Sequence, residues 1–184
     1  MAWTRIALLL LLAALPGVAR SQPLAEIERA SATLRQQNAL PPRPAQELLQ
    51  KFRRAIDWQS PRSRGAAQFR TALNEALAEF WQNPAAGLAR QVAAQRFLVV
   101  MPGCGTQCQV LLLVDLATGV AINPDITTGL GASFALNNAA IIADPASEIR
   151  QLLGPDGLAT PVQSAGYVLS PQGTLRRRFA IEVR

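Results

Sequence analysis

Two cysteines, Cys104 and Cys108, are the only thiols of the chain, and a strand-like apolar run lies on each side of them. Gly103 and Gly105 permit a sharp turn, which can bring two α-carbons within the ~4.4–6.8 Å that a disulfide requires. Paired cysteines are typical of exported proteins, and the N-terminus described below predicts export. We therefore predict a structural disulfide that shapes a hairpin tip and stabilises it by about 2 kcal/mol.

Two other uses of these thiols are open. Redox enzymes usually place their cysteines two residues apart at a helix N-terminus, which lowers the pKa of one thiol. Here Cys108 leads into the strand-like run 109–114 instead. Two sulfurs with no histidine nearby would make only half of a zinc site. The pattern favours a structural bridge and predicts neither a metal nor a cofactor.

The chain contains no histidine, which excludes Ser-His-Asp, Cys-His and histidine–zinc catalysis. A pair of carboxylates could still perform acid–base chemistry, as in glycosidases. None of the candidates lies in a recognisable catalytic motif, and each also fits a turn former or a helix cap. The candidates are Asp115, Asp125, Asp144, Glu148 and Asp156. A pocket lined by Asp115, Asp125 or Asp144 would favour an enzyme.

The first 21 residues have the three parts of a secretory signal peptide. Arg5 supplies a positive charge, and residues 6–15 are apolar. Small residues precede a cleavage site after Ala19, and Ala19-Arg20-Ser21 offers a second choice. The alternative is an uncleaved anchor, but a spanning helix needs about 20 apolar residues, twice this run. We expect a periplasmic or secreted protein without a membrane span after cleavage.

Composition favours a globular domain, with 49% apolar and 16% charged residues. The net charge of +6 comes almost entirely from arginine, since Lys51 is the only lysine. A basic exported protein could meet an anionic surface polymer, lipid headgroups or an acidic protein, although the arginine excess also fits a compositional bias. Few aromatic residues and no known module argue against a nucleic-acid partner.

Periodicity changes from helical to strand-like near residue 96, so we predict an α+β fold with N-terminal helices followed by a mainly antiparallel β-sheet with a disulfide-clipped hairpin. The predicted parts are a signal peptide (1–21), a helical segment (22–62) and an α+β domain (63–184). Helices are expected at 24–37, 44–57, 63–82 (with Ser63 as its cap), 84–94 and 145–153. Strands are expected at 96–101, 109–115, 119–122, 132–143, 166–170 and 174–183, with a turn at 115–119 whose Gly119 takes positive φ.

The last predicted strand carries three consecutive arginines, Arg176, Arg177 and Arg178. Alternation places Leu175, Phe179, Ile181 and Val183 on one face, and Arg177 interrupts that face. An edge position or a β-bulge would explain the interruption. The three arginines fit either a solvated edge or an anion contact.

Several segments of the chain match a known pattern: Phe69–Leu73, Gly103–Cys108, Asp115–Gly119, Phe134–Ala143 and Asp144-Pro145. Through these segments the chain from about residue 62 to 184 resembles a family of small, exported, uncharacterised bacterial proteins. That resemblance implies a mixed α+β fold with a disulfide loop, and it implies no activity. Met101-Pro102 stands where the family has Trp, and the family's His-containing strand entry is absent.

These observations predict an exported, non-enzymatic binding or accessory protein. Its first candidate contact surface is the hairpin tip, where Gly105, Thr106 and Gln107 would meet a partner. One alternative is an enzyme that works through the thiol–disulfide pair or through carboxylates. Another is an inhibitor of a hydrolase, a role suited to a small, clipped, basic domain.

Overall fold

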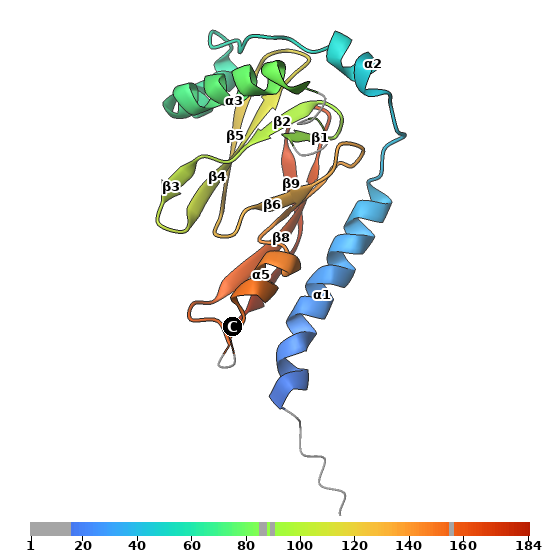
Figure 1. The fold of residues 1–184 in the computed structure, drawn as a ribbon, viewed down its shortest axis with the longest axis vertical. Helices are drawn as coiled ribbons and strands as arrows, with labels where there is room; N and C mark the ends of the chain where they lie inside the picture. Colours follow the sequence, from blue (N-terminus) through green and yellow to red (C-terminus); the bar gives the residue numbers. More distant parts are fainter. Residues whose placement is uncertain (1–15, 85–87, 89–90, 155–156) are drawn as a thin grey trace, which may run out of the picture.

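The computed structural model describes residues 16–84, 88, 91–154 and 157–184, and it confirms an α+β fold with helices first. Figure 1 shows the arrangement of these elements. The helices are α1 (Pro16–Gln37), α2 (Ala45–Gln50), the 3-10 helix η1 (Pro61–Phe69), α3 (Arg70–Gln82) and α5 (Ala146–Leu152). The strands are β1 (Val92–Ala93), β2 (Phe97–Val100), β3 (Gly103–Gly105), β4 (Cys108–Asp115), β5 (Ala121–Thr128), β6 (Ala132–Phe134), β7 (Ala140–Ala143), β8 (Val162–Leu169) and β9 (Leu175–Val183).

The strands form two antiparallel sheets. In the N-terminal sheet, β4 pairs with β2, β3 and β5, and β1 extends the sheet beyond β2. The C-terminal sheet has the order β6-β7-β8-β9, so β9 is an edge strand. The segment 129–131 carries the chain from one sheet to the other. Gly131 has φ of +94°, a left-handed conformation that glycine adopts without steric cost.

The two sheets share an apolar core. Leu111 and Leu113 of β4 pack with Ile141 of β7 and Leu169 of β8. The alternate β4 residues, such as Leu112, face the opposite way and pack against α3. Alternation along each strand therefore gives every central strand two buried faces.

Helices cover the outer faces of both sheets (Figure 1). Leu73, Leu77 and Phe80 of α3 pack on the N-terminal sheet. Leu34 of α1 packs on Ala140 and Ile142 of the C-terminal sheet. The layer order is thus helix, sheet, sheet, helix, and both sheets are buried from two sides.

Helix α1 runs the length of the C-terminal sheet (Figure 1). Leu24, Ile27 and Leu34 of this helix are buried. Most of the predicted signal peptide lies outside the described residues, and its cleavage stays a prediction. None of the described helices has the length and apolar character needed to cross a membrane.

Several predicted elements are wrong in extent. The helix expected at 24–37 begins at Pro16, and the strand expected at 166–170 begins at Val162. The helix expected at 44–57 ends at Gln50, because the segment after it is extended toward the N-terminal sheet, where Arg53 N donates to Leu116 O (2.5 Å). The strand expected at 132–143 is two strands joined by a turn at 135–139. The strand expected at 119–122 continues to Thr128.

Ser63 does not cap a helix. It lies inside η1, and its hydroxyl donates to Asp57 O (2.8 Å) and accepts from Ala121 N (3.1 Å). The polar side chain is therefore used to tie η1 to β5. Asn83 ends α3. Of the helix expected at 84–94, residues 85–87 and 89–90 lie outside the described residues, and its predicted end is wrong because Val92–Ala93 form strand β1.

The interruption by Arg177 comes from both predicted causes, since β9 is an edge strand and contains a bulge. Gly166 pairs with Phe179 and Tyr167 pairs with Arg177, so Arg178 is the extra residue. The bulge reverses the facing of side chains along the strand. The prediction that Leu175 shares a face with Phe179 is therefore wrong: Leu175 packs between the sheets, and Phe179 faces α1.

Candidate functional site

A cavity of about 610 Å³ lies between the ends of the two sheets. Its walls come from the β3–β4 hairpin, the end of β5 with the segment after it, the end of β7, and β8 with the loop that precedes it. The volume falls in the ~300–1,000 Å³ range of small-molecule sites. The apolar core between the sheets ends here, so the lining becomes mixed in character.

The segment 129–131 and Asp144 lie side by side because β6 pairs with β7. Ala132 is the partner of Ala143, and Asp144 N donates to Gly131 O (2.9 Å). The Asp144 carboxylate then turns back, and its Oδ1 accepts hydrogen bonds from Gly129 N (2.9 Å) and Leu130 N (2.5 Å). The carboxylate thereby fixes the crossing between the sheets and lines the cavity at the same time.

Asp144 is a buried acid with an unusual backbone. It is 6% exposed and has φ of +48°, a left-handed conformation that few residues with a side chain adopt. Burial raises its pKa, and the two backbone hydrogen bonds only partly offset that rise. No salt bridge of Asp144 occurs in the described part of the chain, where the carboxylates that pair with cations belong to other residues. Strained backbone and a buried charge together are typical of functional sites.

Two further polar side chains lie beside Asp144 on the inner face of the N-terminal sheet. Thr128 of β5 and Gln109 of β4 are register partners. Thr128 lines the cavity and is 3% exposed. Thr128 Oγ1 and Gln109 Oε1 are buried and have no hydrogen-bond partner among the described residues. Unpaired buried polar atoms are rare in native proteins, and a ligand is one way to satisfy them.

Tyr167 of β8 supplies the phenol of the cavity. Burial raises the pKa of its hydroxyl, the positive charge of Arg177 opposes that rise, and the negative charge of Asp144 adds to it. The tyrosine therefore lies within electrostatic range of both groups. Leu130, Leu158 and Val162 form an apolar part of the lining.

The hairpin β3–β4 carries the predicted disulfide, which is confirmed with Cα atoms of Cys104 and Cys108 5.2 Å apart. Of the candidate contact residues, Gln107 lines the cavity together with Cys108, and it takes a left-handed φ of +55°. Gly105 and Thr106 are exposed at the tip and are not part of the lining. The tip of the hairpin thus borders the cavity with Gln107 and Cys108, whereas Gly105 and Thr106 face solvent.

The other candidate carboxylates do not join Asp144. Asp115 is buried in the predicted turn, where Arg96 binds both of its oxygens (2.7 Å each) and Thr118 Oγ1 donates to Oδ2 (2.7 Å). Burial alone would raise the pKa of Asp115, but these hydrogen bonds and the arginine charge lower it. Asp125 is exposed on β5, near the irregularity in its pairing with β4, and Glu148 lies on α5. Asp156 lies outside the described residues.

The cap reading of Asp144 is wrong, because Pro145 is the N-cap of α5 and no side chain caps that helix. The turn reading of Asp115 is confirmed: Gly119 N donates to Asp115 O (2.7 Å), and Gly119 has φ of +78°. The chain therefore uses one aspartate for its turn and buries another beside a cavity. No group of three or more potential metal ligands occurs in the described part of the molecule.

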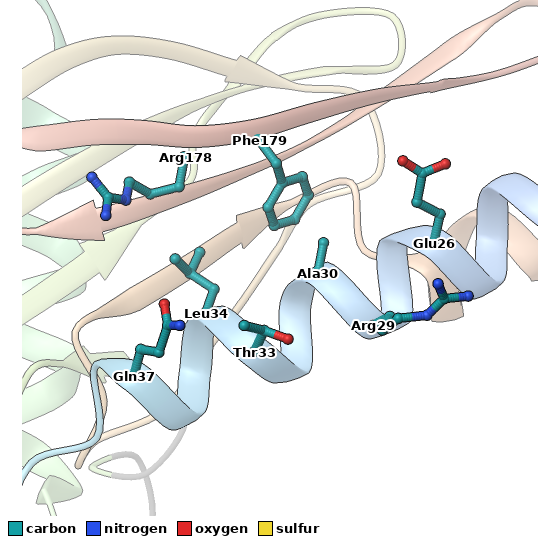
Figure 2. A pocket seen from close by; sticks show the side chains of 8 residues that line it. All are labelled: Glu26, Arg29, Ala30, Thr33, Leu34, Gln37, Arg178 and Phe179. Atoms are coloured by element: carbon teal, nitrogen blue, oxygen red, sulfur yellow. The ribbon is translucent and has the colours of Figure 1, made fainter.

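The three arginines of β9 are exposed along the sheet edge. Arg178 lines a groove of about 390 Å³ between α1 and β9. Figure 2 shows the Phe179 ring directed at α1, and the guanidinium groups of Arg178 and Arg29 pointing away from each other. Diverging arginines do not form a chelating anion site, and the predicted anion contact stays a prediction.

The sequence singled out Asp144, Gln107 and Cys108, and it missed Thr128, Gln109 and Tyr167. Thr128 and Gln109 face inward only through the register of β4 with β5, and Tyr167 only through its pairing in the C-terminal sheet. A polar residue at an inward position of an otherwise apolar strand was the available signal. In comparisons with known proteins, no family model, no curated protein and no solved structure matches this chain.

Proposed function

We propose that this is an exported binding protein that holds a small amphipathic molecule in the cavity between its two sheets. Export is supported by the signal-like residues 1–21 and by the disulfide, a bond that persists in oxidising compartments. The cavity has the size of a small-molecule site and a lining that is polar on one side and apolar on the other.

The observation that carries this proposal is the group of buried polar atoms at the cavity wall. Thr128 lines the cavity, and its hydroxyl oxygen is buried without a partner in the described chain. The Asp144 carboxylate has only backbone donors among the described residues. A buried polar group without a partner costs about 1–3 kcal/mol. A ligand that bonds these atoms would recover that free energy, whereas a purely structural core would use apolar residues here.

A carboxylate-based enzyme is the second candidate, because the cavity contains Asp144 and burial raises the pKa of that acid. Two-carboxylate hydrolysis needs a pair of acids about 5–9.5 Å apart. Asp144 is the one carboxylate among the described residues of the lining. The thiol–disulfide alternative has less support, since the cysteines lie on a β-hairpin and not at a helix N-terminus. Binding therefore accounts for more of the site than catalysis does.

Amide NMR of the oxidised protein tests the proposal with three probes of equal chain length: hexanol, hexylamine and hexanoate. We expect at least one probe to shift amide signals of residues around the cavity in a saturable manner. Ala159→Trp adds bulk at an exposed position of the cavity wall and should weaken that binding at least about tenfold. Ala30→Trp places the same bulk in the groove beneath Phe179 and should leave it unchanged.

Two results would contradict the proposal. In the first, none of the three probes shifts cavity signals. In the second, Ala159→Trp and Ala30→Trp affect binding equally, which would place the probes elsewhere. A hydrolase inhibitor would instead lower lysozyme or protease activity when the purified protein is added, and Ala159→Trp would leave that inhibition intact.

A further inference from the structure

We infer that the ligand carries a protonated amine, which binds the Asp144 carboxylate and the Thr128 hydroxyl. This inference rests on the proposed binding function and names the chemical class of the ligand. It follows from three features of the polar wall: its hydrogen-bonding character, its charge and the apolar surface beside it.

The two buried polar side chains of the lining, Asp144 and Thr128, each leave an oxygen that can accept a hydrogen bond. Asp144 Oδ1 already accepts two backbone N–H groups, and no hydrogen bond to Oδ2 occurs in the described chain. Thr128 Oγ1 is unpartnered in the described chain, and a hydroxyl oxygen can accept as well as donate. An ammonium group offers three N–H donors and no acceptor. Its donor set therefore complements the set of atoms that the protein leaves unpaired.

The charge of the wall leads to the same ligand class. Asp144 is buried, and its two hydrogen-bond donors are uncharged amides. The charge of Arg177, on the edge strand, acts on Tyr167 of the lining. A buried carboxylate is stabilised strongly only by a cation that replaces lost hydration. A carboxylate or phosphate ligand would instead meet repulsion from Asp144.

An apolar surface adjoins the polar wall. Leu130 is one of the two residues whose amides bond the carboxylate. Leu158 and Val162 also line the cavity and pack in the same apolar cluster as Leu130. An amine with a short alkyl or aryl portion would place its nitrogen at Asp144 and its carbon chain along these residues. A small, purely polar cation would leave this apolar surface exposed, so we expect the amine to be amphipathic.

Affinities of hexylamine and hexanol, measured by amide NMR on the oxidised protein near neutral pH, test the inference. The two probes share their chain and differ in the charged head. We expect hexylamine to bind at least about tenfold more tightly than hexanol, and Asp144→Asn to remove this preference. The asparagine oxygen can still accept from Gly129 and Leu130. Thr128→Val should weaken hexylamine about threefold or more and hexanol less.

Asp125→Asn is the matched control. Asp125 also has a left-handed φ, of +59°, but it is exposed and lies outside the cavity lining. This variant should keep the full preference for the amine. Loss of the preference in both variants would indicate a nonspecific charge effect and would overturn the inference.

The outcomes separate the two proposals. If hexanol binds in the cavity as tightly as hexylamine, the amine inference fails and the binding function stands. If the wild type binds hexylamine more tightly than hexanol, but Asp144→Asn binds hexylamine as tightly as the wild type does, the assigned carboxylate is wrong. If neither probe nor hexanoate binds, the binding function itself fails. A fold check by the amide spectrum of each variant excludes loss of binding through unfolding.

Discussion

Replacing Asp144 with asparagine should stabilise the ligand-free protein near pH 7. The carboxylate is 6% exposed, and its donors in the described chain are two backbone amides. The substitution removes a buried charge and keeps an oxygen that can accept the same two hydrogen bonds. An inadequately satisfied buried group costs about 1–3 kcal/mol, so we expect a gain of about 1–2 kcal/mol. For a chain of this size, each kcal/mol corresponds to about 2–4 °C in Tm.

The gain should depend on pH in a defined direction. Because burial raises the pKa of Asp144 above its ordinary value of 3.8, the folded protein binds this proton more tightly than the unfolded chain. Ionisation therefore costs stability as pH rises from about 3.8 through the folded pKa, and the full cost is present above that pKa. Below about pH 3.8 both states are protonated, and the advantage of asparagine should disappear.

Urea unfolding of the wild type and of Asp144→Asn, measured between about pH 3.5 and 7, gives this dependence. Asp125→Asn serves as the control and should change the free energy of unfolding by less than about 0.5 kcal/mol at every pH. The reasoning is refuted if Asp144→Asn is less stable than the wild type at neutral pH. It is also refuted if the gain is the same at both ends of the range, because the charge would then not be its cause.

Three further predictions concern the parts that hold the site. Replacing Cys104 and Cys108 by serine should lower the free energy of unfolding by about 2 kcal/mol, and reductant should then have no further effect on Tm. Asp115→Asn should lower the free energy of unfolding by about 2–3 kcal/mol near pH 7, because it breaks an ion pair in which Arg96 binds both carboxylate oxygens. The loss should shrink as the pH falls below about 3.8 through the lowered pKa of Asp115 in the folded protein. An equal loss at low pH would contradict the ionic origin. Gly166→Ala should cost about 1–3 kcal/mol, since an added Cβ would overlap a phenylalanine ring, whereas Gly65→Ala has room and should be near neutral in the same thermal scan.

Local sequence patterns predicted those features that depend on a few neighbouring residues. The Cys104–Cys108 bridge, the turn that ends at Gly119, and the irregularity near Arg177 all follow from short-range geometry, and the structure confirms them. The order of helices and strands followed from the change of period near residue 96, for the same reason.

Features that depend on contacts distant in sequence were missed or wrong. Asp144 reads as a helix cap because Pro145 follows it, yet its carboxylate bonds amides 14 and 15 residues earlier in the chain. Ser63 likewise reads as a cap, but it bonds Ala121 of β5. A short polar side chain has several possible partners, and only the register of the folded strands decides among them.

The pKa of the Asp144 carboxyl, followed by carbon-13 NMR with and without hexylamine, tests the central claim most directly. In the free protein we expect this pKa above its ordinary value of 3.8, because burial disfavours the charge. Saturating hexylamine should lower it, since a bound ammonium favours the carboxylate, and hexanol should not. An Asp144 pKa that is the same with and without saturating hexylamine would contradict the assignment of this cavity as an amine site.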